Sequence, residues 1–265
     1  MKIGFIGLGN MASAMIGGML KAGEVQPGDL LGSDKSEQMR AVAAEKFGMT
    51  VLEDNAQVAE QSDILFLAVK PIFFPDIMSD IRGKIKEKAV VVSIAAGQTV
   101  QNIQDGLQSS TAKIIRLMPN TPALVGEGCT AVCNNENVTK EELETVKKLL
   151  QTFGKAEELP ERLFDAFIGI SGSSPAYVFM FIEAMADAAV NAGMPRNLAY
   201  TFASQAVLGS AKMVLETGKH PGELKDMVCS PGGTTIAAVK VLEEKGFRAA
   251  VIDAVDACVE KSRNL

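Results

Sequence analysis

The chain has 265 residues, of which 47% are hydrophobic and 22% are charged, and this composition suits one or two globular domains with a sizeable core. Its formal net charge is −6 and its pI is near 5.1. An acidic chain is a poor match for nucleic acid or an anionic membrane surface, because both attract a basic surface.

The start of the chain, Met1, Lys2 and Ile3, leads directly into a strand pattern, and we see no apolar run long enough to span a bilayer. We therefore expect no signal peptide, no membrane partner and a cytoplasmic protein. The four cysteines have no CxxC spacing and the chain has one histidine, so we expect no metal site and reduced, mostly buried thiols at Cys129, Cys133, Cys229 and Cys258.

The first strand is predicted at residues 2–7. A glycine-rich loop at its end leads into a predicted helix at residues 12–21. The loop has the GxGxxA pattern of dinucleotide-binding proteins. Gly7 makes the tight turn, Gly9 lets a pyrophosphate approach the backbone, and Ala12 allows close helix packing. The predicted cofactor contacts are Gly7, Leu8, Gly9, Asn10, Met11 and Ala12; a glycine turn without a ligand is the alternative.

The second predicted strand ends near Ser33, about where such folds read the cofactor ribose. The residues at this strand end give conflicting indications of the preferred cofactor. Asp34 suits the ribose hydroxyl of NADH, whereas Ser33 and Lys35 suit the 2′-phosphate of NADPH. A solvated loop is the alternative for Lys35.

Strands and helices continue to alternate, with apolar strands predicted at residues 63–69, 89–94 and 113–117. Small residues and prolines follow each strand, which favours a ligand cleft along the carboxyl edge of a parallel sheet. A last strand, a helix at residues 140–152 and a strand around Ala156 complete a domain of residues 1–158.

The pattern becomes helical from residue 159 to residue 265. Helices are predicted at residues 161–168, 175–191, 196–216, 221–228, 235–244 and 247–261. The helix at 175–191 is apolar around most of its surface, which favours burial in a homo-oligomer over enclosure by its own domain. The glycine and serine residues at 169–174 suggest a hinge or part of a pocket.

A turn between two of these helices, SPGGTT at residues 230–235, suits an anion. Pro231 ends the incoming helix, the two glycines allow the chain to turn, and Thr234 or Thr235 is expected to cap the next helix. The free N–H groups of a helix start attract a carboxylate or a phosphate. A plain helix-turn-helix corner is the alternative.

The chain closely resembles the pyrroline-5-carboxylate reductases, the enzymes of the last step of proline biosynthesis. The resemblance runs from Ile3 to about Arg263. It rests on GFIGLGNMA at 4–12, LFLAVKP at 65–71, SIAAG at 93–97, MPNTP at 118–122, SGSSPAY at 171–177 and, above all, HPGELKDMVCSPGGTTIAAVKVLE at 220–243.

The resemblance implies a Rossmann-type dinucleotide-binding domain followed by an all-helical dimerisation domain. The expected reaction is hydride transfer from NADPH, with NADH as the other possible donor, to the imine carbon of 1-pyrroline-5-carboxylate. The substrate carboxylate would lie on the N–H groups of Gly233 and Thr234, and the Thr235 hydroxyl on the ring nitrogen. The substrate-binding set is Ser230, Gly232, Gly233, Thr234 and Thr235, with Thr235 as the catalytic residue.

The resemblance also implies further cofactor contacts, namely Ser33, Asn55, Ala68, Val69, Lys70, Pro71, Ala95, Ala96 and Gly97. Lys35 is added to this set from its place at the second strand exit. Family dimers interleave their helical domains, and rings of dimers also occur. The lone histidine, His220, precedes the substrate motif by more than two helical turns and is interpreted as a structural residue at a helix start.

Two other interpretations remain open at this point. A 3-hydroxyacid dehydrogenase has a similar two-part build, but it places a catalytic lysine in the helical domain and would leave the SPGGTT turn unexplained. A regulatory module that binds NADP without turnover is the non-enzyme alternative, and the presence of Thr235 argues against it.

Overall fold

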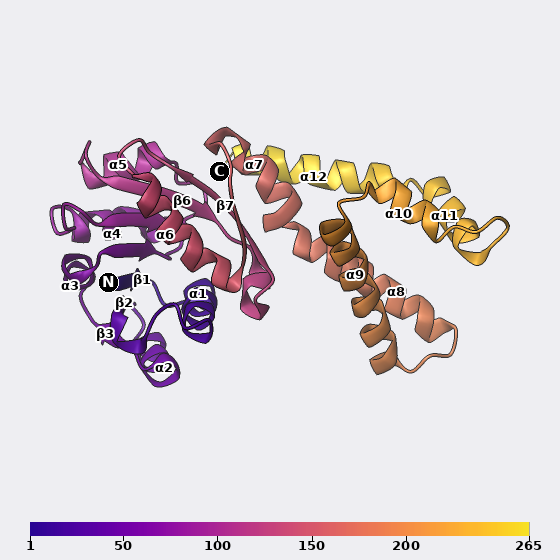
Figure 1. The fold of residues 1–265 in the computed structure, drawn as a ribbon, viewed down its shortest axis with the longest axis horizontal. Coiled ribbons are helices and arrows are strands. Elements are labelled where there is room, and N and C mark those ends of the chain that lie inside the picture. Colours follow the sequence, from indigo (N-terminus) through magenta and orange to yellow (C-terminus); the bar gives the residue numbers. More distant parts are fainter. Residues whose placement is uncertain (265) are drawn as a thin grey trace. The chain divides into compact units, whose positions relative to one another are not determined.

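The computed structural model describes residues 1–264. The chain divides into two compact units, Met1–Gly172 together with the chain end from Lys261, and Ser173–Glu260. The first unit is an α/β sheet domain and the second is entirely helical, as Figure 1 shows. The predicted fold class, a Rossmann-type domain followed by a helical domain, is confirmed.

An eight-stranded sheet with the order β3-β2-β1-β4-β5-β6-β7-β8 forms the centre of the first unit. Strands β3 to β6 in this order are parallel, β7 runs antiparallel to β6, and β8 is parallel to β7. The strands are β1 (Ile3–Ile6), β2 (Leu30–Ser33), β3 (Thr50–Leu52), β4 (Ile64–Leu67), β5 (Val90–Ser93), β6 (Lys113–Met118), β7 (Gly128–Asn134) and β8 (Gly154–Glu158).

The central strands are short apolar runs because helices cover the sheet on both sides. All four residues of β1, β4 and β5 are buried, and the rings of Phe5 and Phe66 stack across β1 and β4 with their centroids 4.7 Å apart. This burial explains why the apolar runs predicted parallel strands. The sequence analysis missed β3, which has one exposed and two partly exposed residues at the edge of the sheet.

Three helices pack on each face of the sheet (Figure 1). The core on one side includes residues of α1 (Asn10–Lys21), α2 (Glu37–Phe47) and α6 (Lys140–Leu150). The other side includes residues of α3 (Asn55–Gln61), α4 (Phe74–Ile81) and α5 (Val100–Leu107). Short 3₁₀ turns occur at Pro27–Asp29, Pro71–Phe73, Thr121–Val125, Gln151–Phe153 and Glu161–Leu163.

The segment that leads to the second unit is helical throughout. It contains α7 (Phe164–Phe167), a π-turn at Ile168–Gly172 and then α8 (Ser174–Asn191). The glycine and serine residues therefore do not interrupt the helix; they widen one turn of it. Asn120 fixes this turn, because its Nδ2 donates to the carbonyl and the Oγ of Ser171 over 3.2 and 3.1 Å.

The sequence analysis did not predict the length of this continuous helix. Glu161–Asn191 spans 31 residues and contains an 18-residue window with a mean hydropathy of 1.2. Among the described residues it is the one helix long and apolar enough to cross a membrane by length and composition. The glycine and serine residues at 169–174 hid its length in the sequence.

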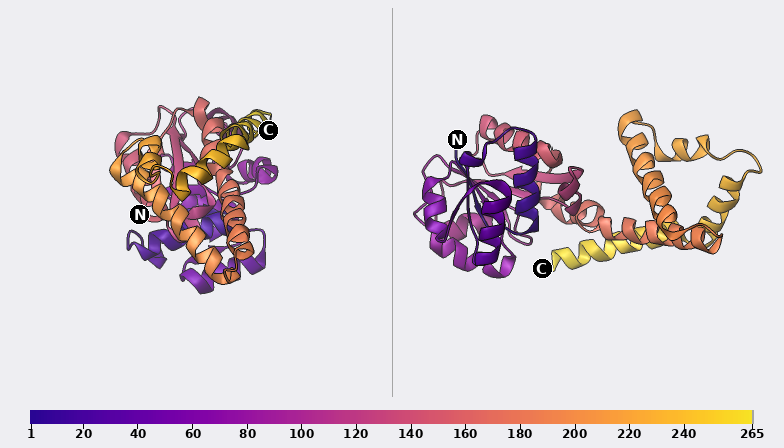
Figure 2. Two further views of the ribbon diagram at one scale, coloured as in Figure 1. Left: turned by 90° about the vertical axis from the view of Figure 1, so that its right-hand side faces the viewer. Right: turned by 90° about the horizontal axis from the view of Figure 1, so that it is seen from below.

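The second unit consists of a hairpin of α8 and α9 (Arg196–Thr217), followed by α10 (Pro221–Met227), α11 (Thr234–Glu244) and α12 (Phe247–Arg263). Figure 2 shows the hairpin from two further directions. Within Ser173–Glu260 the buried residues are Ala186, Ala199 and Ala203. These helices therefore do not enclose a large core of their own.

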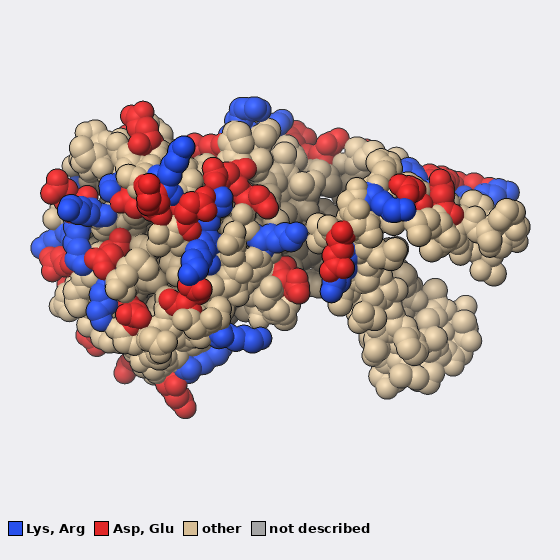
Figure 3. Space-filling view, in the orientation of Figure 1, with Lys and Arg blue, Asp and Glu red and all other residues tan. Residues whose placement is uncertain are grey.

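Large apolar side chains remain exposed on these helices. On α8, Phe179 is 63% exposed and Met180 is 69% exposed, and on α9 Phe202 is 57% exposed. The alternative of a central helix enclosed by its own domain is therefore wrong. Figure 3 shows charged side chains spread over the sheet domain but few over the α8–α9 hairpin. Such a surface is typical of an interface between subunits.

All four cysteines are free thiols, but each is only partly buried, so the expectation that most are buried is wrong. Burial and the nearby Glu161 carboxylate raise the pKa of Cys133 to about 12.

Candidate functional site

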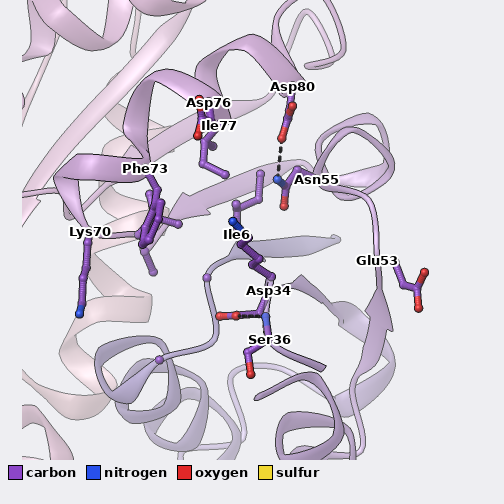
Figure 4. Close-up of a pocket in the computed structure, with 15 residues that line it drawn as sticks. Ile6, Asp34, Ser36, Glu53, Asn55, Lys70, Phe73, Asp76, Ile77 and Asp80 are labelled. Atoms are coloured by element: carbon purple, nitrogen blue, oxygen red, sulfur yellow. Dashed lines mark hydrogen bonds between the residues drawn. The ribbon is translucent and has the colours of Figure 1, made fainter. Parts of the chain in front are cut away.

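A cavity of about 650 Å³ opens where the strand order reverses, between the carboxyl ends of β1 and β4. Open parallel sheets bind their ligands at this switch point. Figure 4 shows that side chains from several elements converge on it. The lining residues are Ile6, Gly7, Gly9, Asp34, Lys35, Ser36, Glu53, Asn55, Ala68, Val69, Lys70, Phe73, Asp76, Ile77 and Asp80.

The glycine loop at the end of β1 has the geometry that a pyrophosphate needs. Gly7 has a φ of +93°, and a Cβ there would lie 2.5 Å from the carbonyl oxygen of Ala68, so only glycine fits. Gly9 precedes α1 in an extended conformation, with no side-chain cap, and a Cβ there would meet nothing within 4 Å. The helix start therefore presents N–H groups to open space.

Asp34 holds this loop to the next one. Its Oδ2 accepts a hydrogen bond from the Leu8 N–H and its Oδ1 accepts one from the Ser36 N–H, both at 2.8 Å. The Arg40 guanidinium donates to the carbonyl of Asp34, also at 2.8 Å. Both carboxylate oxygens thus have partners within the protein.

A chain of three polar side chains forms another wall of the cavity. The Ser33 hydroxyl donates to Oδ1 of Asn55 over 2.7 Å, and Nδ2 of Asn55 donates to Asp80 on α4 over 2.9 Å. An ionised carboxylate accepts only, which fixes the orientation of the amide. One amide proton and one carbonyl lone pair of Asn55 remain for a ligand.

Ser33, expected in the 2′-phosphate site, does not line the cavity. Ser33 is fully buried and its hydroxyl is directed to Asn55. Ser36, three residues later, is the serine that lines the cavity, beside Lys35. The Lys35 ammonium lies 6.0 Å from the centre of the Phe73 ring.

Seven of the predicted cofactor contacts line the cavity, namely Gly7, Gly9, Lys35, Asn55, Ala68, Val69 and Lys70. The other predicted contacts are not part of its lining, namely Leu8, Asn10, Met11, Ala12, Ser33, Pro71, Ala95, Ala96 and Gly97. Leu8 in the glycine loop and Ala12 in α1 are buried, and Ala95 is buried after β5.

The sequence analysis did not assign several lining residues to the cofactor: Ile6, Ser36, Glu53, Phe73, Asp76, Ile77 and Asp80. Asp76 and Asp80 are four residues apart on α4, so they share one face of that helix. Their helical spacing after the Lys70–Pro71 strand exit is the signal that could have identified them.

The SPGGTT turn lies between α10 and α11 in the second unit. Gly232 has a φ of +68°, and the Gly233 N–H donates to the Ser230 carbonyl over 3.0 Å. A Cβ on Gly233 would lie 2.5 Å from the Ser230 hydroxyl oxygen. The two glycines thus make a tight turn that ends at the first residue of α11, Thr234.

Two details of this turn differ from the expectations. The N-cap of α11 is Gly233 and not a threonine, and it makes no side-chain cap. The Gly233 N–H is already bonded to Ser230, so it is not free for a carboxylate. The free donors of a helix start are those of its first turn, here Thr234, Thr235 and Ile236.

His220 is the N-cap of α10, because its Nδ1 accepts from the Gly222 N–H over 3.1 Å. The prediction of a structural role at a helix start is confirmed. Within residues 1–264 no group of three or more His, Cys, Asp or Glu residues could hold a metal ion.

The doubly wound sheet, the glycine loop and the cavity at the switch point define a dinucleotide-dependent oxidoreductase. Residues 2–97 match the family model "NADP oxidoreductase coenzyme F420-dependent", and residues 161–265 match the model "Pyrroline-5-carboxylate reductase dimerisation". With full-length relatives well above 30% identity, the chain belongs to the pyrroline-5-carboxylate reductase family.

Three relatives illustrate the similarity. The pyrroline-5-carboxylate reductase of Escherichia coli (strain K12) is 54% identical over 264 residues, which cover 100% of this chain and 98% of the relative. A structure of the Coxiella burnetii enzyme is 34% identical with a TM-score of 0.93, over 99% of this chain and 97% of that chain. The Plasmodium falciparum enzyme with NADP bound is 33% identical with a TM-score of 0.89, over 99% and 97%.

Proposed function

We propose that this protein reduces 1-pyrroline-5-carboxylate to L-proline with hydride from NADPH. The observation that carries the proposal is the full-length similarity to pyrroline-5-carboxylate reductases, 54% identity over 100% of the chain. The SPGGTT turn and the glycine loop supply the two kinds of site that this reaction requires.

The cavity residues fit the cofactor. The open space before Gly9 suits the pyrophosphate, the Asn55 amide suits a ribose, and Lys35 and Ser36 suit a 2′-phosphate. We extend the cofactor site beyond the cavity lining to Asn10, Met11 and the loop at Ala95, Ala96 and Gly97. NADPH, when bound, supplies the hydride.

The start of α11 suits the substrate carboxylate. The N–H groups of Thr234 and Thr235 are at the positive end of an 11-residue helix, where an anion is stabilised. Ser230 and Gly232 shape the turn that brings the chain to this start, and the bond from Gly233 to Ser230 holds it.

Thr235 is the proposed catalytic residue. In the reaction the hydride adds to the imine carbon, the carbon–nitrogen double bond becomes a single bond, and the nitrogen carries a proton. The Thr235 hydroxyl, one residue into the helix, orients the ring by a hydrogen bond to this nitrogen. An imine is basic enough to arrive with its proton, so the hydroxyl need not act as a strong acid.

We propose a homodimer with interleaved helical domains as the basic assembly. The exposed apolar residues of α8 and α9 and the match to a dimerisation model support it. We place the functional boundary between residues 158 and 159, two residues before that match begins at residue 161. Mass measurement in solution distinguishes a dimer from a ring of dimers, and cell fractionation tests the proposed cytoplasmic location.

The deciding experiment is to incubate the purified protein with pyrroline-5-carboxylate and either NADPH or NADH and to follow the loss of nicotinamide absorbance. We expect turnover with NADPH and formation of proline. Lack of turnover with both cofactors would overturn the proposal, while turnover with NADH alone would overturn only the cofactor assignment. An added 3-hydroxyacid with oxidised cofactor tests the alternative dehydrogenase activity.

A further inference from the structure

Asp34 occupies the position at the end of β2 where many dinucleotide-binding proteins have an acid that reads the ribose. An acid there favours NADH, because it accepts from the 2′-hydroxyl and repels a 2′-phosphate. The chain nevertheless matches an NADP oxidoreductase model over residues 2–97. Asp34 therefore needs another explanation.

The hydrogen bonds of Asp34 supply one. Its two carboxylate oxygens accept from two backbone N–H groups that are 28 positions apart in sequence, Leu8 in the glycine loop and Ser36 before α2. Leu8 lies between Gly7 and Gly9, so the bond fixes the part of the loop that a pyrophosphate approaches. Figure 4 shows the Asp34 carboxylate directed at Ser36.

The second bond orders the other loop. Ser36 is the N-cap of α2, and its hydroxyl accepts from the Met39 N–H over 3.3 Å. Arg40, in the first turns of α2, donates to the backbone carbonyls of Asp34 and Lys35. The backbone of Asp34, Lys35 and Ser36 is thus held by the Asp34 carboxylate and by Arg40.

We propose that Asp34 is a positioning residue that holds the glycine loop and the loop after β2 together, and that it does not select the cofactor through the ribose. This inference rests on the proposed use of a nicotinamide cofactor. Charge-assisted bonds from both carboxylate oxygens are strong, and their loss changes the shape of a site that all dinucleotides share.

The two roles predict different binding patterns. If Asp34 holds the loops, its removal weakens the binding of NADPH and the binding of NADH by a similar factor. If Asp34 binds the ribose hydroxyl, its removal weakens NADH binding. NADPH binding then stays unchanged or becomes tighter, because the repulsion of the 2′-phosphate is relieved.

The test measures dissociation constants for NADPH and NADH by titration calorimetry on the full-length protein without substrate. Asp34→Asn is isosteric but accepts at only one oxygen, and Asp34→Ala removes both acceptors. We expect Asp34→Asn to raise both constants about tenfold and to leave their ratio within about threefold of the wild-type ratio. Asp34→Ala should have a larger effect, and Asp34→Asn alone is sufficient if Asp34→Ala does not fold.

Asp76→Asn is the matched control, because Asp76 is a carboxylate in the same cavity without a bond to either loop backbone in the described contacts. It measures the effect of one lost charge. A selective loss of NADH binding in Asp34→Asn, or tighter NADPH binding beyond that of Asp76→Asn, would overturn the inference. Since binding is measured without pyrroline-5-carboxylate, failure of the proposed reaction is observed separately.

Discussion

Arg116 and Glu161 form an ion pair in which Nη1 lies 2.8 Å from Oε1. The same Glu161 oxygen accepts from the Val100 N–H at the start of α5, and the Arg116 guanidinium lies 4.6 Å from the centre of the Phe164 ring. One carboxylate therefore joins β6, α5 and the start of the long helical segment.

We predict that Glu161→Gln lowers the free energy of unfolding by about 2–4 kcal/mol, because it leaves the buried Arg116 without a counter-charge. Denaturant titration followed by circular dichroism measures the change. Glu158→Gln is the matched control, since Glu158 pairs with Lys147 on the surface and its loss should cost less than about 1 kcal/mol. Equal effects of the two variants would contradict the special role of Glu161.

Thr235 tests the substrate site. Thr235→Ala should lower kcat by about 10- to 100-fold, because an oriented hydroxyl is lost, while the dissociation constant for NADPH stays unchanged. Thr235→Ser keeps the hydroxyl and should recover most of the rate. Steady-state kinetics and calorimetry together give both quantities, and an unchanged kcat in Thr235→Ala would remove this residue from catalysis.

A substitution at Gly9 distinguishes a cofactor-binding loop from a glycine turn without a ligand. A Cβ at Gly9 meets no protein atom within 4 Å and the backbone there is extended, so Gly9→Ala should change the melting temperature by no more than about 2 °C. The added methyl group occupies the space that the pyrophosphate needs, and NADPH binding should weaken at least tenfold. Unaltered binding would show that the phosphates lie elsewhere.

Cys133 should resist alkylation. Burial and Glu161 raise the pKa of its thiol from 9.0 to about 12, so its thiolate fraction near pH 8 falls about 1000-fold. The greater nucleophilicity of a high-pKa thiolate offsets part of this fall and leaves a rate about 50-fold below that of a free cysteine. Iodoacetamide labelling followed by peptide mass spectrometry measures the rate, and labelling at the rate of free cysteine would contradict the shift.

The sequence predicted the parts of the fold that depend on local pattern. Buried parallel strands read as apolar runs, which identified β1, β4, β5 and β6, and the helices of the second unit follow their periodicity. It missed β3, because a strand of three residues without a buried one carries too little pattern. It also took the glycine and serine residues before α8 for a break, although a π-turn accommodates them within the helix.

Within the site, local motifs were predictable and side-chain partners were not. Gly7 and Gly9 followed from spacing alone. Ser36 lines the cavity and the buried Ser33 does not, which depends on which face of a strand end is buried. Asp80 reaches Asn55 across 25 positions of sequence. Likewise, the bond from Gly233 to Ser230 is a property of the folded turn, which composition does not reveal.

The small core of the helical unit has a consequence for cells that contain two versions of the chain. With Ala186, Ala199 and Ala203 as the buried residues of Ser173–Glu260, these helices gain most of their apolar contacts from a second copy in the proposed dimer. Chains that share this surface assort at random, so equal amounts of a normal and a defective version place about half of all dimers in mixed pairs. An inactive variant that keeps this surface should therefore be found in mixed dimers with the normal chain.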